Sequence, residues 1–268
     1  MDSTTAAWEK VINDRDPMND AMQAEFDTVA EWTAEVALDL GPEYFVPAAC
    51  RGSGSPATLQ WLIDGLAIRS SDRMLDCGAG AGGPAAFATE VSGVRPILTE
   101  PEVGACRAAR RMFGSTMLQA ASDLPLRSGT CDVAWSLGVL CTVPDQPLLL
   151  RELRRVLRPS GRLGLLVFVA TGELPADRPE GNDFPTWDRL LQLLAEAGLT
   201  VDAAATEADL DAAPTDWKAR ADAVHDELAS RHGDYDRWLT SVEQSKLIGN
   251  LLSNRQVVGT AIIASPAA

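Results

Sequence analysis

The sequence predicts an α/β fold, namely a doubly wound, seven-stranded and mostly parallel sheet. Three observations favour it. From residue 73 onward, short apolar runs typical of buried strands alternate with segments of helical periodicity. Several of these runs are apolar on both faces, as in a parallel sheet covered by helices on both sides. A glycine-rich turn, Gly78–Gly83, separates the first strand from the helix that follows it.

Residues 1–70 precede the first strand and are predicted to form an N-terminal helical cap. Helices are predicted over Asp20–Leu40, which carries apolar residues at helical spacing, and over Ala57–Leu66. Residues 44–47 and 51–56 are predicted to form a loop between these helices, because the stretch is interrupted by Gly, Pro and Ser.

The alternating region, residues 71–208 together with 253–268, is the predicted Rossmann-like core. The turn residues Arg158–Gly161 are predicted to stop the helix that precedes the fifth strand. Strands are predicted over 73–77, 95–99, 116–119, 131–136, 162–170, 199–206 and 257–264, and helices over 84–91, 102–113, 148–157 and 187–198.

Residues 209–252 lie between the last two predicted strands and are too long for a plain connection. Their helical periodicity and high charge predict an inserted helical lid over the ligand crevice. Two alternatives to the lid stay open for this segment, namely a peripheral helical decoration and a contact surface between two copies of the chain. The second alternative would make the protein a homodimer.

Polar residues follow four of the predicted strands, where ligands of parallel α/β sheets bind. The spacing Gly78-x-Gly80-x-x-Gly83, with Glu100 downstream to hold a ribose, matches a dinucleotide fingerprint. Asp76, just before the turn, argues against that ligand, because a pyrophosphate needs donors and positive potential there. S-adenosylmethionine has no phosphate and carries an ammonium and a sulfonium, so a carboxylate beside the turn suits it.

The stretch Asp76–Gly82 resembles the first motif of class I S-adenosylmethionine-dependent methyltransferases of the small-molecule type, and the resemblance extends over Leu59–Ala170. It implies that S-adenosylmethionine is the cofactor. Glu100 would accept both ribose hydroxyls, and Asp123 would accept from the adenine amino group. The cofactor-binding residues that the resemblance implies are Asp76, Gly78, Gly80, Glu100, Pro101, Asp123, Leu124, Ser136 and Leu137.

The chain departs from this family where many relatives with small-molecule acceptors carry a histidine after the fourth strand. Leu140-Cys141-Thr142 stands there instead. The two histidines of the chain, His225 and His232, both fall in the predicted lid, and with Tyr44 they are the candidate catalytic residues. The alternatives are exposed helix histidines and a packed tyrosine. The spacing of the histidines is not that of a helical metal pair, so no metal is predicted.

A net charge of −15 argues against a nucleic-acid partner, because such binding depends on Lys and Arg. No apolar run approaches the roughly 20 residues that span a bilayer, which argues against a membrane partner. Five cysteines without C-x-x-C spacing and the absence of a signal-peptide pattern predict a cytoplasmic protein. Two other functions stay open, an NAD(P)-dependent oxidoreductase and a non-catalytic cofactor-binding protein.

Overall fold

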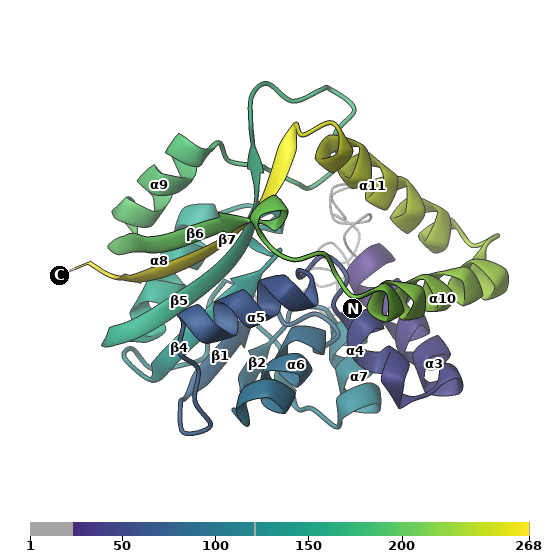
Figure 1. Ribbon diagram of the computed structural model, residues 1–268, viewed down its shortest axis with the longest axis horizontal. Coiled ribbons are helices and arrows are strands. Elements are labelled where there is room, and N and C mark those ends of the chain that lie inside the picture. The colour runs from purple at the N-terminus through teal and green to yellow at the C-terminus, as the bar shows by residue number, and fades with distance from the viewer. Residues whose placement is uncertain (1–23, 121, 268) are drawn as a thin grey trace, which may run out of the picture.

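The computed structural model describes residues 24–120 and 122–267, which form a seven-stranded sheet with helices on both faces (Figure 1). The strand order is β3-β2-β1-β4-β5-β7-β6. Neighbouring strands from β3 to β5 are parallel, whereas β7 is antiparallel to both β5 and β6. The predicted α/β fold is therefore confirmed. The strands are β1 (Met74–Cys77), β2 (Ile97–Thr99), β3 (Met117–Leu118), β4 (Cys131–Leu137), β5 (Leu157–Ala170), β6 (Leu199–Thr206) and β7 (Val257–Pro266).

The two faces of the sheet are covered by different helices because alternate strand residues point to opposite sides. Met74 belongs to a buried cluster with α5 (Pro56–Gly65) and α6 (Gly83–Ser92), whereas Leu75 belongs to a cluster with α8 (Gln146–Val156) and α9 (Trp187–Glu196). Helix α7 (Val103–Phe113) extends the layer of α6 (Figure 1). This burial on both faces is what makes the central strands almost wholly apolar.

The N-terminal part of the described chain is helical. A π-helical turn, η1 (Ala24–Val29), continues as α3 (Ala30–Leu40), so the predicted helix is present from Ala24, and its first residues lie outside the described part. The loop predicted over residues 44–47 is wrong. A 3₁₀ turn, η2 (Pro42–Tyr44), leads into α4 (Phe45–Ala49). The apolar residues of α4 are buried, and Pro47 falls in its first turn, where a proline forfeits no helical hydrogen bond.

The helix before the fifth strand ends where the turn residues Arg158–Gly161 predict, to within two residues, because α8 ends at Val156. The strand β5 begins earlier than predicted, at Leu157, whose side chain is fully buried and whose backbone pairs with Cys131. The next register pair is Val133 with Arg162, so residues 158–161 form an irregularity of β5 without register partners in β4.

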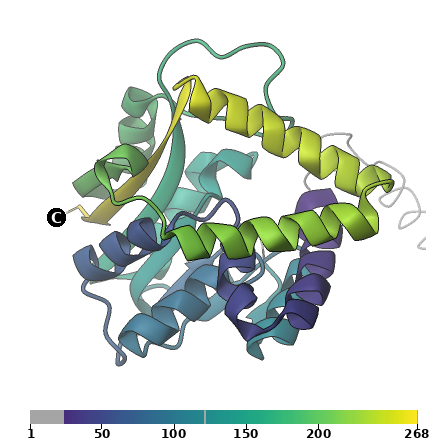
Figure 2. The same cartoon turned by 45° about the vertical axis from the view of Figure 1, so that its right-hand side comes forward.

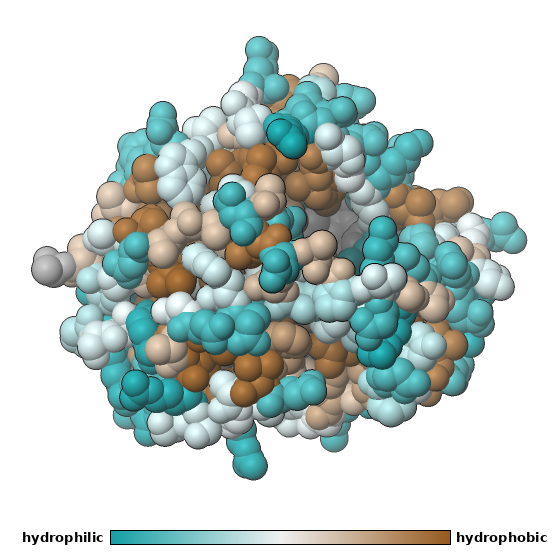
Figure 3. Space-filling view, in the orientation of Figure 1, coloured by the Kyte–Doolittle hydropathy of each residue, from teal (hydrophilic) through white to brown (hydrophobic). Residues whose placement is uncertain are grey.

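Helices α10 (Thr215–His232) and α11 (Asp236–Ser253) form an antiparallel hairpin in the segment predicted as the insertion (Figure 2). The hairpin leads into Val257 of β7, which pairs with Ala170 at the carboxyl end of β5. It therefore starts and ends at the edge of the sheet where the parallel strands end. The space-filling view shows an opening in the surface between α10 and α11, with apolar side chains along part of its rim (Figure 3).

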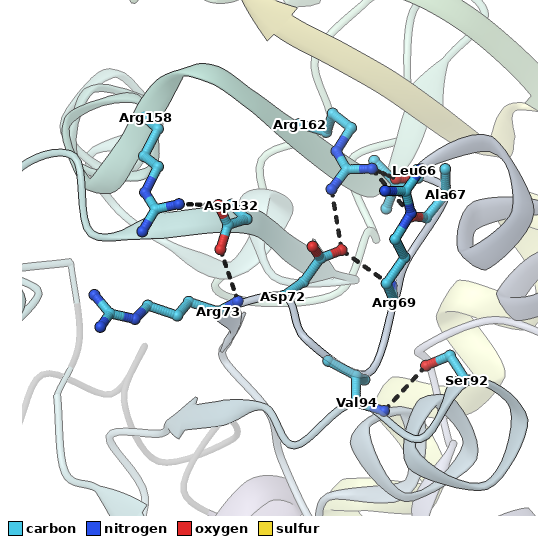
Figure 4. Close-up of polar contacts among 10 residues, drawn as sticks. All are labelled: Leu66, Ala67, Arg69, Asp72, Arg73, Ser92, Val94, Asp132, Arg158 and Arg162. Atoms are coloured by element: carbon cyan, nitrogen blue, oxygen red, sulfur yellow. Dashed lines mark hydrogen bonds and ion pairs between the residues drawn. The ribbon is translucent and has the colours of Figure 1, made fainter.

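The opposite edge of the sheet, where the parallel strands begin, is held by ion pairs (Figure 4). Asp72 accepts from the backbone N–H of Arg69 and from the guanidinium of Arg162, both at 3.0 Å. Asp132 accepts from the backbone N–H of Arg73 at 2.9 Å and pairs with Arg158. These charges lie just before β1 and near the starts of β4 and β5, and they are paired with one another, so this edge is a structural one.

Candidate active site

The glycine turn after β1 is fixed on one side and open on the other. The N–H groups of Gly78 and Ala79 donate to the Thr99 carbonyl at 2.9 and 3.0 Å, which ties the turn to the end of β2. A Cβ at Gly83 would lie 2.5 Å from the backbone carbon of Ala49 in α4, whereas a Cβ at Gly80 would meet nothing within 4 Å. Gly80, at φ +52°, is thus the point where a ligand can approach the backbone.

Glu100, at the end of β2, lies beside this open glycine. Its carboxylate accepts from the N–H of Gly80 at 2.8 Å through Oε2 and from the N–H of Glu102 at 3.1 Å through Oε1. Burial raises its pKa, and the two backbone hydrogen bonds oppose the rise. Each oxygen retains a further lone pair, so the carboxylate can still accept from two hydroxyl groups of a ligand.

Asp76, at the end of β1, is almost fully buried, and its Oδ2 has no hydrogen-bond partner. Burial raises its pKa to about 7, and the neighbouring charge of Glu100 adds to the rise, while the indole of Trp135 acts against it. The Trp135 N–H nevertheless has no partner within hydrogen-bond geometry. An orphaned, buried carboxylate oxygen at the carboxyl edge of the sheet fits a missing cationic ligand.

The loop after β3 carries Asp123 and Leu124 and is held by α8. Leu124 donates its N–H to Glu152 Oε2 at 3.1 Å, and Arg155 donates to the carbonyls of Leu124 and Leu126 at 3.0 and 2.7 Å. The amide expected beside an adenine therefore already has a protein partner. Asp123 itself is exposed. Sequence analysis missed Glu152 and Arg155, although their i, i+3 spacing on a helix was visible.

The side chains of Ser136 and Leu137, two further residues predicted to bind the cofactor, are engaged within the protein itself. Ser136 donates from Oγ to the Cys77 carbonyl at 2.9 Å, which links β4 to β1, and the Leu137 side chain is buried. Pro101 is exposed, and its carbonyl accepts from Gln119 at 3.1 Å. Any contact of Ser136 or Leu137 with a ligand would thus be made by the backbone.

The two predicted catalytic histidines pack against aromatic rings, and Tyr44 lies in the buried cluster that also includes Ala81 of the glycine turn. His232, the last residue of α10, stacks on Trp32 of α3 with ring centroids 4.0 Å apart, and Tyr235 contacts both rings edge-on. His225 is exposed and lies 5.1 Å from the Trp238 ring. Tyr44 is half-buried and packs among the alanines of α3 and α4. Each side chain has a packing role in this geometry.

Arg51, in the turn after α4, contacts Ser245 of α11. The next residue, Gly52, presses its carbonyl against Gly138, where a Cβ would lie only 2.3 Å from the Gly52 oxygen. The 50–55 turn therefore lies over the end of β4 and touches the hairpin at the same time, which places Arg51 between the sheet edge and α11.

No three His, Cys, Asp or Glu side chains within residues 24–120 and 122–267 are grouped so that they could hold a metal ion. Within the same residues, no helix combines the length and apolar character needed to cross a bilayer.

The strand order with a reversed last strand, the glycine turn after β1 and the buried acid at the end of β2 agree with the resemblance to class I S-adenosylmethionine-dependent methyltransferases. Residues 75–165 match the family model of a methyltransferase domain.

Named relatives agree with this class. Over 110 residues the chain is 36% identical to 27-O-demethylrifamycin SV methyltransferase of Amycolatopsis mediterranei, which covers 37% of this chain and 40% of that protein. Over 121 residues it is 30% identical to methyltransferase GfsG of Streptomyces halstedii, which covers 42% and 44% of the two chains. The matches thus span less than half the length of these curated relatives.

Among solved structures, the [4+2]-cyclase SpnF resembles this chain with a TM-score of 0.63 at 19% identity, covering 81% of this chain and 84% of that one. Geranyl diphosphate methyltransferase in complex with S-adenosylmethionine does so with a TM-score of 0.57 at 15% identity, covering 79% and 85%. At these identities the likeness shows the fold alone.

Proposed function

We propose that the protein transfers a methyl group from S-adenosylmethionine to a small-molecule acceptor by in-line displacement. The observation that carries this proposal is the pairing of the orphaned, buried Asp76 carboxylate with the open backbone at Gly80. A cationic ligand without phosphate is the chemistry that such a site favours, and two buried acids oppose a pyrophosphate. The NAD(P) alternative is therefore the weaker one.

The residues divide the binding of this cofactor between them. Asp76 would face the amino-acid end, Gly78 and Gly80 would let the backbone approach the ligand, and Glu100 would accept from the ribose hydroxyls. Asp123 would accept from the adenine amino group. The cofactor, when bound, supplies a methyl group already activated on a sulfonium. The protein then has to hold the acceptor in line and exclude water, and orientation of this kind supplies several kcal/mol.

The hairpin α10–α11 is proposed as the lid that shields this reaction. It joins the core at the carboxyl edge and contacts the 50–55 turn through Arg51 and Ser245. A small-molecule acceptor agrees with the name of the rifamycin methyltransferase among the curated relatives. The net charge of −15 speaks against a nucleic-acid acceptor, because such binding depends on Lys and Arg. A homodimer through the hairpin remains the alternative role for this segment.

The test is formation of S-adenosylhomocysteine when the protein is incubated with S-adenosylmethionine and fractionated metabolite pools. Acceptor-dependent product is expected with wild type and with Glu90→Gln, an exposed acid on α6. Glu100→Gln should lower turnover at limiting cofactor by about 10-fold or more, because hydrogen bonds to a charged group contribute about 1.5–3 kcal/mol. Cofactor binding without turnover in any pool would favour the non-catalytic alternative instead.

A further inference from the structure

Two buried polar atoms on neighbouring strands have no hydrogen-bond partner, Oδ2 of Asp76 and Nε1 of Trp135. These residues are Cα partners in the parallel ladder of β1 and β4. Register partners project from the same face of the sheet, and neighbouring strands lie about 4.8 Å apart. An orphaned acceptor and an orphaned donor therefore stand side by side beneath the glycine turn.

Such a pair needs a physical explanation, because buried donors and acceptors are almost always satisfied in folded proteins. Trp135 is fully buried among apolar residues of α5 and β5, and its N–H can donate but cannot accept. The acceptor that lies beside this N–H in the ladder is the Asp76 carboxylate.

The indole N–H of Trp135 acts on the ionisation of Asp76 against the other groups around that carboxylate. The titratable side chain that acts on the pKa of Asp76 is Glu100, from the end of β2. The charge of Asp76 in turn helps to raise the pKa of the Cys50 and Cys77 thiols. Burial raises the pKa of both thiols, to about 12 for Cys77, so they stay neutral. Burial and Glu100 oppose the negative charge of Asp76, whereas the indole favours it.

We propose that Trp135 is a positioning residue that acts through Asp76, its indole N–H donating to the carboxylate when that carboxylate faces the cationic end of the cofactor. The inference deepens the proposed function and rests on it for the identity of the ligand. Without the indole, Asp76 still lies at the site, but its ionised form loses the donor that offsets burial.

The test compares the pH dependence of cofactor affinity in matched variants. Calorimetric titration with S-adenosylmethionine between pH 5.5 and 9 uses wild type, Trp135→Phe, Asp76→Asn and Trp61→Phe, the last at another indole packed against the same buried cluster. For wild type, affinity should rise with pH as Asp76 ionises. For Trp135→Phe, the rise should move upward by about one pH unit, a loss of about tenfold in affinity at pH 6–7 that disappears by pH 9.

Asp76→Asn should bind weakly with little dependence on pH, and Trp61→Phe should follow wild type. A purely structural role for Trp135 predicts something else, namely a loss of affinity by the same factor at every pH. That result, or an unchanged profile in Trp135→Phe, would overturn the proposal.

A second measurement needs no ligand and separates this proposal from the proposed function. The chain has seven tryptophans, whose indole N–H signals can be followed by NMR. One indole signal should titrate in wild type and stop doing so in Asp76→Asn, and the same signal should be missing in Trp135→Phe if that variant folds. If no indole signal responds to Asp76, the pair does not exist. If wild type fails to bind S-adenosylmethionine while the signal titrates, only the proposed function falls.

Discussion

At the scale of single residues, the glycines after β1 do two different jobs. Gly83 lets α6 approach α4, because a Cβ there would lie 2.5–2.6 Å from the backbone of Ala49. Gly80 has open space on its Cβ side and a left-handed φ of +52°. One glycine therefore serves packing, and the other serves the ligand.

The two alanine substitutions should separate these jobs. Gly83→Ala is expected to lower the free energy of unfolding by about 1–3 kcal/mol, since backbone cannot move aside as a flexible side chain does. Gly80→Ala should cost about 1–2 kcal/mol through its φ and weaken S-adenosylmethionine binding by about tenfold or more, because the methyl group enters the ligand space. Urea unfolding measures the free energy of unfolding, and calorimetry measures cofactor affinity. Weaker cofactor binding by Gly83→Ala than by Gly80→Ala would refute the assignment of Gly80 to the ligand and Gly83 to packing.

Asp76 makes a second prediction, on stability against pH. Burial raises its pKa to about 7 from an ordinary value of 3.8, so between about pH 4 and 7 the native state binds a proton that the unfolded state has released. This contribution stabilises the ligand-free protein fully at low pH and is lost as pH rises through 7. Asp76→Asn should therefore be more stable than wild type at pH 8, by up to about 4 kcal/mol, with a smaller difference at pH 5.

The comparison is made by denaturant unfolding at each pH, and Glu90→Gln serves as the exposed-acid control. The stability advantage of Asp76→Asn over wild type should grow from pH 5 to pH 8. An advantage that stays the same would show that burial does not raise the pKa of the carboxylate.

Sequence alone predicts Asp76, Gly80 and Glu100 as site residues, because the turn and the strand ends carry distinctive residue types. It could not reveal the role of Trp135, since an aromatic residue inside an apolar strand is most simply a core residue. Only the register of β1 and β4 shows that its N–H lies beside a carboxylate.

At the scale of elements, α8 holds the loop that carries Asp123. Glu152 and Arg155 form an ion pair at 2.6 Å, and between them they bind the amide and carbonyl of Leu124 and the carbonyl of Leu126. The loop is therefore positioned by side chains of a helix that does not itself reach the site.

Glu152→Ala should loosen this loop. Loss of its hydrogen bonds is expected to cost about 1–3 kcal/mol and to leave Arg155 without its carboxylate. Hydrogen exchange of residues 122–130 should accelerate, and S-adenosylmethionine affinity should fall several-fold. Arg151→Ala, at an exposed position of the same helix, is the control. Unchanged exchange in Glu152→Ala would show that the loop is held by other contacts.

Most elements of the core follow from periodicity, including strands β4 and β6 to within one residue of prediction. The error at residues 44–47 has a physical cause. Pro47 favours a loop locally, but its burial in α4 overrides that preference. Tertiary packing of this kind has no signature in a short window of sequence.

At the scale of the whole molecule, the α10–α11 hairpin is fastened at its far end to the N-terminal helix. His232 stacks on Trp32, and Arg231 pairs with Asp39 of α3 at 2.6 Å. Arg107 of α7 pairs in turn with Glu31 of α3 at 2.9 Å. A continuous set of contacts thus runs from the hairpin through α3 to the helix that follows Glu100.

Two substitutions distinguish a packing role of His232 from a role as a general base. If it only packs, His232→Ala should destabilise the protein by about 1 kcal/mol, and His232→Phe, which keeps a ring on Trp32, should restore both stability and turnover. A general base would be lost in both variants, with a fall of about 10²-fold or more in kcat. Turnover lost equally in the two variants would contradict the packing role, and His225→Ala is the exposed control.

The sequence of the core does not indicate which acceptor is used. The segment proposed to cover the acceptor is the hairpin, where the chain has few distinctive residue types. Charge and helical periodicity predict helices in this segment, but not that α10 packs against α3 and α4 and that α11 packs against η1.

The most direct test of the account is calorimetric titration of the wild-type protein with S-adenosylmethionine and, separately, with NADPH at pH 8. The account predicts saturable binding of S-adenosylmethionine at one site per chain, weakened by about tenfold or more in Glu100→Gln, and no binding of NADPH. Binding of NADPH with no heat from S-adenosylmethionine would contradict it.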